Sequence, residues 1–359
     1  MKIAILMPGY FEENIGGAEL QAKHLAQIAA ENRHNVYYIF LSTGKIYPNQ
    51  LGINLFPVLR NKLANKIGNI KYLYALSVFK ILQHIMPDVI YSRTGSALAG
   101  IGAFYARKIG VKNVFHIAHD RDVEPKKIEW SRSYLIPENK LIEYGIQKAD
   151  IIIAQTEYQA KKIGNNYSRE AIVIPNGHPQ PLTKDFPKPK TCNHVIWIAN
   201  WKPIKQPEVF IQLANRLSSM PEVSFTMVGR TDNYDWLQTE AEKAGIDVKG
   251  EVSNHQVNEM LSRCHILVNT SKQEGFSNTF IQAWMRMVPV VSLQVDPDNV
   301  LEKESIGFCS GSFDQLVKDT KRLIADDNLR NEMGERAKAY AMKNHSMKNM
   351  DKILGLVIA

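Results

Sequence analysis

Cysteine and long apolar segments are both scarce in this sequence of 359 residues. The three cysteines, Cys192, Cys264 and Cys309, are far apart and form no Cys-x-x-Cys pair, which argues against a disulfide framework and against a zinc site. No stretch approaches the roughly 18 apolar residues that a membrane-spanning helix needs. We therefore expect a protein of the reducing cytoplasm.

A secretory signal and nucleic-acid-binding modules are also missing. The first apolar run is short, and Pro8, Glu12 and Glu13 follow it too soon for the apolar core of a signal peptide. There are no paired Cys/His ligands, no aromatic RNA-binding strand and no helix-turn-helix spacing. Nucleic acid is therefore not an expected partner.

Positive charge is in excess, with a formal net charge of +8. Such a balance suits nucleic acid, an anionic membrane or a phosphorylated substrate. Between Arg60 and Lys80 the sequence has basic and apolar residues but no acidic residue. This pattern is typical of a segment lying on an anionic bilayer, and equally of a core-packed helix with solvated lysines on its outer face. Both interpretations stay open, so an anionic membrane surface is one expected partner.

Short β-rich runs alternate with helical patterns, and this alternation predicts parallel βαβ units with a ligand at the carboxyl ends of the strands. In the first half we expect strands at 3–7, 36–41, 89–91, 114–117 and 151–154, and helices at 18–32, 96–109 and 139–148. In the second half we expect strands at 195–199, 224–228, 247–249, 266–269 and 290–293, and helices at 207–218, 236–244, 257–263 and 278–287.

A stretch dense in proline and lysine separates these two halves, and it cannot continue a helix or a central strand. We therefore predict an α/β protein with Rossmann-like domains at 1–178 and 192–345, joined by a linker at 179–191. A final helical pattern at 347–357 has an apolar face.

Glu274 and Gly275 stand between an expected strand and an expected helix. Backbone N–H groups at such a turn are free to face an anion such as a diphosphate, and the Glu274 carboxylate could accept hydrogen bonds from sugar hydroxyls. The alternative is an ordinary helix N-terminus whose dipole Glu274 favours.

Lys202 and Lys205 lie in the turn between the first strand and the first helix of the second half. A lysine placed on a leaving diphosphate stabilises the negative charge that grows as the bond to the sugar breaks. The alternative is that both lysines are ordinary solvated residues.

In the first half, Gly16 and Gly17 precede the first helix and permit close approach of a ligand to the backbone. No Gly-Lys-Ser/Thr follows them, so this is not a Walker A loop. Gly100-x-Gly102 falls inside a predicted helix and is better explained by helix packing.

Histidines flank the end of the strand expected at 114–117. His116 and His119 could bind a sugar hydroxyl there, although a lone histidine is more often structural. Asp120-x-Asp122 and Asp296-x-Asp298 match a short acidic metal-binding pattern that recurs by chance, so we do not expect a metal.

Taken together, these motifs resemble the retaining GT-B glycosyltransferases of the family 4-like, group 1 type, which includes many enzymes of bacterial polysaccharide and lipopolysaccharide synthesis. The resemblance covers nearly the whole chain. It depends on the order and spacing of Gly16-Gly17-Ala18-Glu19, His119-Asp120, Ile174-Pro175-Asn176-Gly177, Lys205, Val228-Gly229, Glu274-Gly275-Phe276 and Pro289-Val290-Val291.

The resemblance implies roles for particular residues. Glu274 is a donor-sugar contact, Lys205 together with Lys202 is the diphosphate clamp, and His119 approaches the donor sugar near the reacting centre. By the same resemblance, Val252 offers backbone hydrogen bonds to the nucleotide base, and Gly16 and Gly17 lie by the phosphates and the acceptor. Further donor-side contacts are implied at Gly275, Phe276, Ser277 and Gln282. The helix at 346–359 is expected to cross back to the N-terminal domain.

Three positions depart from the family pattern. Gln282 replaces the second glutamate of the signature, but an amide can still bond a ribose diol. Asn200 replaces an arginine, which leaves Lys202 as the substitute cation. Met287 replaces a glycine and is expected to narrow the packing behind the donor loop.

We therefore expect a retaining glycosyltransferase that moves a sugar from a nucleotide-diphosphate sugar, with a UDP sugar favoured, to a hydroxyl of a sugar, glycolipid or polysaccharide acceptor, without metal or other cofactor. One alternative is a GT-B sugar-nucleotide epimerase. Another is a non-catalytic sugar-nucleotide-binding subunit, which the departures at Gln282 and Asn200 make conceivable.

Overall fold

The computed structural model describes residues 1–13, 16–42, 47, 52–59, 74–125, 138–181, 188, 193–220 and 222–359. The chain forms two compact units. Unit 1 comprises Met1–Gly177 and Lys348–Ala359, and unit 2 comprises His178–Met347. Most of the basic stretch between residues 60 and 80, and most of the linker expected at 179–191, lie outside the described residues.

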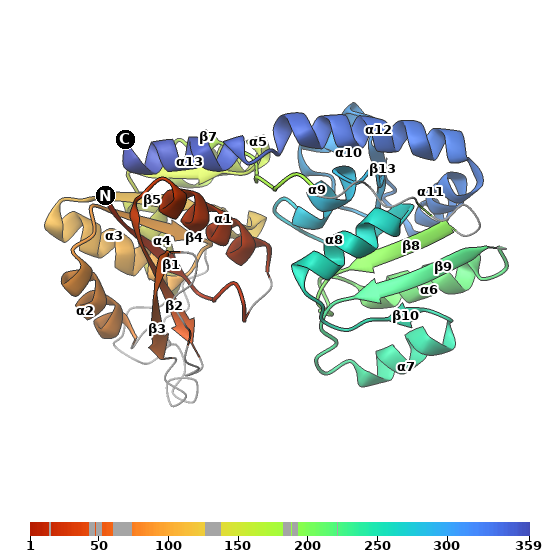
Figure 1. Cartoon of the computed structure of the whole chain (residues 1–359), viewed down its shortest axis with the longest axis horizontal. Helices are drawn as coiled ribbons and strands as arrows, with labels where there is room; N and C mark the ends of the chain where they lie inside the picture. Colours follow the sequence, from red (N-terminus) through yellow and green to blue (C-terminus); the bar gives the residue numbers. More distant parts are fainter. Residues whose placement is uncertain are drawn as a thin grey trace. The chain divides into compact units, whose positions relative to one another are not determined.

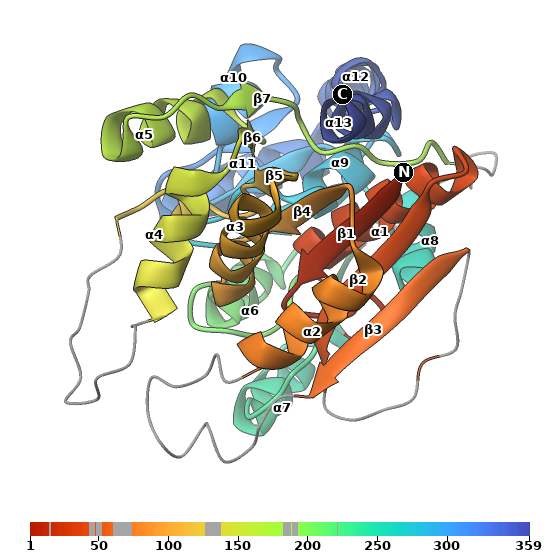
Figure 2. The ribbon, with the colours of Figure 1, turned by 90° about the vertical axis from the view of Figure 1, so that its left-hand side faces the viewer.

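Unit 1 is built on a parallel sheet with the strand order β3-β2-β1-β4-β5-β6-β7. In Figure 2, β3, β2 and β1 lie side by side. The described strands are β1 (Lys2–Met7), β2 (Asn35–Ser42), β3 (Ile53–Leu59), β4 (Val89–Arg93), β5 (Lys112–His116), β6 (Ile151–Ala154) and β7 (Ile172–Val173).

The described helices of unit 1 are α1 (Gly17–Glu31), α2 (Ala75–Ile85), α3 (Ala97–Ile109), the short 3-10 helix η2 (Asp120–Asp122), α4 (Glu138–Lys148), α5 (Glu157–Tyr167) and α13 (Lys348–Ile358). α13 comes from the end of the chain and packs on α1 and β4, so the last helix belongs to the N-terminal unit. A Cβ at Gly100 would collide with the carbonyl of Leu141 on α4, which confirms that this glycine serves helix packing.

Unit 2 is built on a second parallel sheet with the order β10-β9-β8-β11-β12-β13, part of which is visible in Figure 1. Its strands are β8 (Asn193–Ile198), β9 (Val223–Val228), β10 (Asp247–Val248), β11 (Ile266–Asn269), β12 (Val290–Ser292) and β13 (Gly307–Cys309). Its helices are α6 (Pro207–Leu217), α7 (Asp235–Lys243), α8 (Asn254–Arg263), α9 (Asn278–Trp284), the 3-10 helix η3 (Pro297–Asn299), α10 (Val300–Lys303), α11 (Phe313–Ala325) and α12 (Asp327–Asn344).

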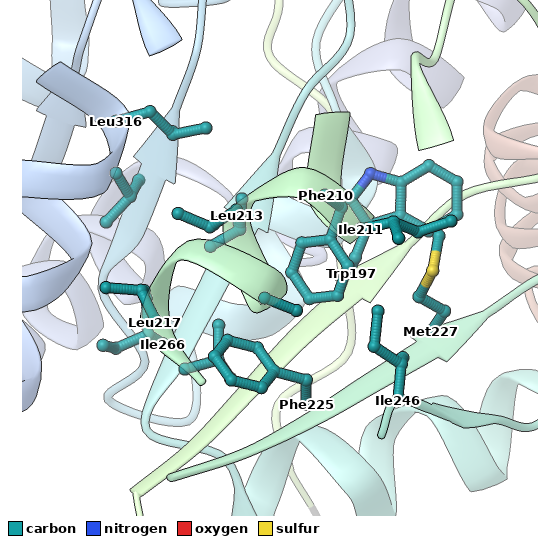
Figure 3. Packing of buried hydrophobic residues seen from close by; sticks show 14 of the residues in the cluster. Trp197, Phe210, Ile211, Leu213, Leu217, Phe225, Met227, Ile246, Ile266 and Leu316 are labelled. Carbon is teal, nitrogen blue, oxygen red and sulfur yellow. The ribbon is translucent and has the colours of Figure 1, made fainter. Parts of the chain in front are cut away.

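The sheet of unit 2 is buried on both faces. Trp197 on β8 packs with Phe210 of α6, and Phe225 of β9 lies against the same helix residue, with ring centroids 6.1 Å apart for the two phenylalanines (Figure 3). Side chains from α8, α9, α10 and α12 form the core on the opposite face. Burial on both faces explains the continuous apolar runs of the central strands β8, β11 and β12.

Sequence periodicity predicted the central strands and most helices within a few residues, but among the elements it missed are β3, β7, β13, α5, α10 and α11. β3 contains Pro57, which argues against a central strand, and the structure places β3 at the edge of its sheet, where proline is tolerated. The helix expected to reach residue 287 ends at Trp284.

Each sheet has a topological switch point, where the chain reverses the direction in which strands are added. This point lies between β1 and β4 in unit 1, and between β8 and β11 in unit 2. Ligands of open α/β sheets bind outside the carboxyl ends of the strands at such points. The residues that follow β8 and β11 are therefore the first place to look for a site in unit 2.

Candidate active site

Lys205 and Glu274 meet at the switch point of unit 2. Lys205 lies in the turn after β8, Glu274 lies in the loop after β11, and the ammonium forms an ion pair with the Oε1 of the carboxylate. The side chains are only 19% and 10% exposed, so the two charges are largely removed from solvent. Two residues that the sequence assigned to one site are thus brought together by the fold.

Thr270 connects the two loops that carry this pair. Its hydroxyl accepts the indole N–H of Trp197 at 2.8 Å and lies 2.7 Å from the carbonyl oxygen of Lys205 and 2.9 Å from that of Gln206. Thr270 is fully buried. Sequence reasoning missed this residue, because its partners lie more than 60 positions earlier in the chain.

Glu274 is held by a second short chain of polar contacts. The hydroxyl of Ser271 donates to Glu274 Oε1 at 2.8 Å, and the backbone N–H of Ser271 donates to Asn269 Oδ1 at 3.1 Å. Asn269 is the last residue of β11, so the sheet itself sets the position of the carboxylate. Ser271 and Asn269 were not singled out from the sequence.

The residues after Glu274 turn inward. The ring of Phe276 is buried against Trp284 and His345, with centroids 6.0 Å and 4.6 Å away, so its side chain belongs to the core. Ser277 precedes the first residue of α9, and its hydroxyl lies 2.8 Å from that of Thr279. Gly275 is buried beside them. A ligand contact at Phe276 therefore falls to its backbone.

Gln282 points toward α8. Its amide nitrogen donates to Asn254 Oδ1 at 2.7 Å and to Asn258 Oδ1 at 3.1 Å, while the residue is only 3% exposed. Both hydrogens of the amide are therefore used, and Gln282 Oε1 takes no part in these two bonds. Gln282, which replaces the glutamate of the family pattern, therefore forms a cluster of three side-chain amides with Asn254 and Asn258.

Lys202 and Val252 lie in the loops that follow β8 and β10. Lys202 is exposed, and Val252 is half-buried against the core beneath α8 and α9. The backbone N–H of Lys205 donates to the carbonyl of Lys202 at 2.8 Å, which closes the turn between them.

His119 in unit 1 belongs to a tight turn after β5. Its backbone N–H and that of Ala118 both donate to Asp122 Oδ2, at 2.9 Å and 3.0 Å, while the side chain of His119 accepts from the backbone of Asp122. Asp120 Oδ1 accepts from the side-chain amide of Gln159 at 2.9 Å. The Asp122 carboxylate therefore holds the turn, and the Asp120 carboxylate connects it to α5.

Gly16 is the N-cap residue of α1, and Gly17 is its first residue. The carboxylate of Glu19 fills the space where a Cβ at Gly16 would lie. The N-terminus of α1 thus already faces a negative charge that favours the helix dipole.

His116 is fully buried, in contrast to the half-buried His119. It lies 2.7 Å from the hydroxyl of Tyr91 and 3.1 Å from the guanidinium of Arg93. Burial lowers the pKa of His116 well below its usual range, and the nearby Arg93 lowers it further. The structure therefore supports a structural role for His116 over a role in sugar binding.

Comparison with known proteins identifies the family. Residues 15–179 match the family described as Glycosyltransferase Family 4, and residues 180–340 match that described as Glycosyl transferases group 1. The chain belongs to the group 1 glycosyltransferases. It is an enzyme of this class, as the sequence predicted.

Relatives of this group 1 glycosyltransferase span most of its length. The glycosyltransferase MJ1178 of Methanocaldococcus jannaschii is 22% identical over 354 residues, covering 94% of this chain and 93% of the relative. A component of the human phosphatidylinositol N-acetylglucosaminyltransferase is 23% identical over 344 residues, covering 89% of this chain and 68% of the relative.

Solved structures show that the glycosyltransferase has the predicted GT-B fold. Anabaena Alr3699/HepE, solved with UDP-glucose, has a TM-score of 0.78 at 17% identity and covers 100% of this chain and 99% of its own. WaaG, described as a glycosyltransferase involved in lipopolysaccharide biosynthesis, has a TM-score of 0.78 at 16% identity, with 99% of each chain covered. Both likenesses concern the fold.

Proposed function

We propose that this enzyme transfers a glycosyl group from a UDP sugar to an acceptor hydroxyl with retention of anomeric configuration. The observation that carries the proposal is the Lys205–Glu274 pair at the switch point of unit 2. Its cation suits a diphosphate and its carboxylate suits sugar hydroxyls, so the pair offers complementary groups to the two halves of a sugar nucleotide. UDP as the nucleotide is favoured by the structural likeness to HepE, which was solved with UDP and with UDP-glucose.

In the proposed reaction the bond from the anomeric carbon to the diphosphate oxygen breaks and a bond to the acceptor oxygen forms on the same face. The leaving diphosphate takes up the acceptor proton. The ammonium of Lys205 stabilises the negative charge that grows on this diphosphate, which is the role that a metal ion would otherwise fill. Glu274 orients the sugar, and His119 is proposed as a further contact of the sugar. We therefore propose a metal-independent reaction.

The proposed acceptor is a sugar, glycolipid or polysaccharide in the synthesis of a bacterial surface polysaccharide or glycolipid, which the structural likeness to WaaG supports. Cytoplasmic action at the inner face of the cell membrane fits this acceptor class. Within the described residues, none of the helices is both long and apolar enough to cross a membrane.

The direct test is incubation of the purified enzyme with UDP sugars and candidate acceptors, followed by NMR of the anomeric proton of the product. Retention in a transferred product supports the proposal, and inversion contradicts it. Release of UDP with an epimerised free sugar and no acceptor requirement favours the epimerase alternative. Tight nucleotide binding with no turnover or donor hydrolysis over hours favours a non-catalytic binding subunit.

We also propose that unit 1 contacts an anionic membrane surface through the basic segment that ends at Lys80. In its described part, Leu76 on α2 is 73% exposed and Lys80 is exposed. Each lysine near an anionic bilayer contributes about 1 kcal/mol of binding free energy, and this attraction falls as salt rises.

Sedimentation with vesicles checks this proposal. The protein should bind anionic vesicles at low salt and neutral vesicles poorly, and Lys80→Glu should weaken the anionic binding. Lys321→Glu makes the same change of charge at an exposed position on α11 and serves as the matched control. Equal binding to both kinds of vesicle, or binding to neither, would contradict the proposal and favour the interpretation of the segment as a core-packed helix.

A further inference from the structure

Arg230 lies two residues after the end of β9, and backbone hydrogen bonds fix its position. Asn200 Oδ1 accepts the backbone N–H of Arg230 at 3.1 Å, and the backbone N–H of Trp201 donates to the carbonyl of Arg230 at 2.8 Å. The preceding Gly229 has φ of 137°, and a Cβ there would collide with the carbonyl of Ala199. Only glycine therefore lets the turns after β8 and β9 approach so closely.

These contacts give the departure at Asn200 a physical role. An arginine at position 200 has no acceptor atom and could not receive the N–H of Arg230. The sequence suggested Lys202 as the replacement for the missing arginine, but the structure connects position 200 to Arg230. A second cation is thus fixed at the carboxyl edge of the sheet, one strand away from the turn that carries Lys205.

The guanidinium of Arg230 faces two carboxylates through its Nε atom. Its Nε lies 3.6 Å from Asp232 Oδ2 and 3.8 Å from Glu251 Oε1, and both distances are too long for hydrogen bonds. Its Nε is buried without a hydrogen-bond partner, and within the described part of the chain no hydrogen bond involves the terminal nitrogens Nη1 and Nη2, while 32% of the side chain is exposed. The planar group therefore presents unused donors.

The charge around Arg230 determines which ligand group its Nη donors can bind. One guanidinium faces two carboxylates, so the cluster has a net negative charge and offers little attraction to another anion such as a diphosphate. A neutral carbonyl oxygen accepts from the Nη donors without this repulsion. Glu251 is also the neighbour of Val252, the residue whose backbone is proposed to lie beside the nucleotide base.

We propose that Arg230 recognises the base of the nucleoside diphosphate and selects a base with a keto group, such as uracil. Uracil, like thymine, presents the O4 acceptor, whereas cytosine presents an amino donor at the same position. If the base presents an amino group to Arg230, two hydrogen-bond donors face each other and neither has an acceptor. Sites built around hydrogen bonds reject such analogues strongly. This inference depends on the proposed function, because it needs unit 2 to bind a nucleotide.

The test is calorimetric titration of the full-length protein with UDP and with CDP. Wild type should bind UDP at least about 10-fold more tightly than CDP. Arg230→Ala should weaken UDP binding by about 10-fold or more and CDP binding by less than about twofold. Lys249→Ala removes another cation from the same edge, one already paired with Asp247 at 2.7 Å, and should leave both dissociation constants unchanged.

Equal weakening of UDP and CDP in Arg230→Ala would assign Arg230 to the ribose or phosphates and overturn base selection. No change in either constant would overturn it as well. If the alanine variant unfolds, Arg230→Lys keeps the charge but lacks the planar fork, so the UDP preference should still fall. An unchanged preference in that variant contradicts the inference. Failure of wild type to bind any nucleoside diphosphate is a distinct result that rejects the proposed function itself.

Discussion

Lys205 is a half-buried cation whose partner in the structure, Glu274, is also a proposed substrate contact. We expect Lys205→Ala to lower kcat/KM by roughly 100-fold to 1,000-fold, because one charge-stabilising donor is lost from the reacting centre. Steady-state kinetics with a UDP sugar measures this. Lys272→Ala, an exposed lysine two residues before Glu274, is the matched control and should keep its activity.

Removing Lys205 also takes away the cation beside the Glu274 carboxylate and leaves the hydroxyl of Ser271 as a donor to it, so thermal unfolding must accompany the kinetics. A folded Lys205→Ala variant that retains more than half of the wild-type activity would exclude Lys205 from the mechanism.

Gln282 offers a second test at the residue scale. If position 282 faces the ribose, Gln282→Glu converts a neutral hydrogen bond into a charge-assisted one, and nucleoside diphosphate binding should tighten by about 0.5 to 1.5 kcal/mol. Asn254 and Asn258 can accommodate the carboxylate by turning their amide nitrogens toward it. Turnover should hardly change, since ribose contacts are similar in the ground and transition states.

Calorimetry with UDP on wild type and Gln282→Glu measures this difference. The double variant Asn258→Ala/Gln282→Glu is the informative control, because it removes one of the two asparagine amides that must turn toward the new carboxylate. Weaker binding in the single variant would mean that the amide cluster requires a neutral side chain, or that position 282 does not face the ribose.

At the scale of the element, the chain just beyond α9 shows what the departure at Met287 costs the backbone. Met287 has φ of 56°, its N–H donates to the carbonyl of Trp284 at 3.0 Å, and the N–H of Val288 donates to that of Ala283 at 3.0 Å. This pattern is a Schellman motif with Met287 at the left-handed position, where glycine avoids the steric cost of a Cβ. The sequence expectation of altered packing did not include this backbone strain.

We therefore expect Met287→Gly to raise the free energy of unfolding by about 0.5 to 1 kcal/mol, despite the loss of a half-buried side chain. Urea denaturation measures the change. Met86, which caps α2 with φ of 49° and is 64% exposed, is a matched position where Met86→Gly loses little packing and should also stabilise. A less stable Met287→Gly beside a more stable Met86→Gly would show that packing at 287 outweighs strain.

At the scale of the whole molecule, buried histidines make stability depend on pH. Burial, opposed by a hydrogen bond to the Pro179 carbonyl and assisted by the nearby Arg286, lowers the pKa of His178 from 6.5 to about 4. The unfolded chain therefore binds a proton below pH 6.5 that the folded chain does not bind until about pH 4. Stability is fully present above pH 6.5 and is lost as the pH falls through this range.

His178→Gln removes this titration, while the similarly buried His116 remains in both proteins. The wild type should therefore lose its stability advantage over the variant as the pH falls from 6.5 toward 4, at about 1.4 kcal/mol for each unit of pKa difference. Denaturant unfolding of both proteins across this range gives the comparison. A gap that stays constant with pH would mean that His178 titrates normally in the folded state.

The sequence by itself determined the alternation of strands and helices, the two-domain α/β organisation and the family. These features are encoded locally, because an apolar run, a glycine before a helix or a Glu-Gly-Phe motif is recognisable within about a dozen residues. Thr270, Ser271 and Arg230 remained hidden for the same reason, since their significance lies in partners that the local pattern does not reveal.

The tertiary structure decided which of these residues meet. Lys205 and Glu274 are 69 positions apart, and they form a pair because β8 and β11 are neighbours in the sheet although β9 and β10 intervene in the chain. Asn200 meets Arg230 because β8 and β9 are neighbours in the sheet, and Gln282 meets Asn254 and Asn258 through the contact of α9 with α8. Strand order depends on how all the apolar faces of the unit are buried at once, and no single segment of the sequence contains that information.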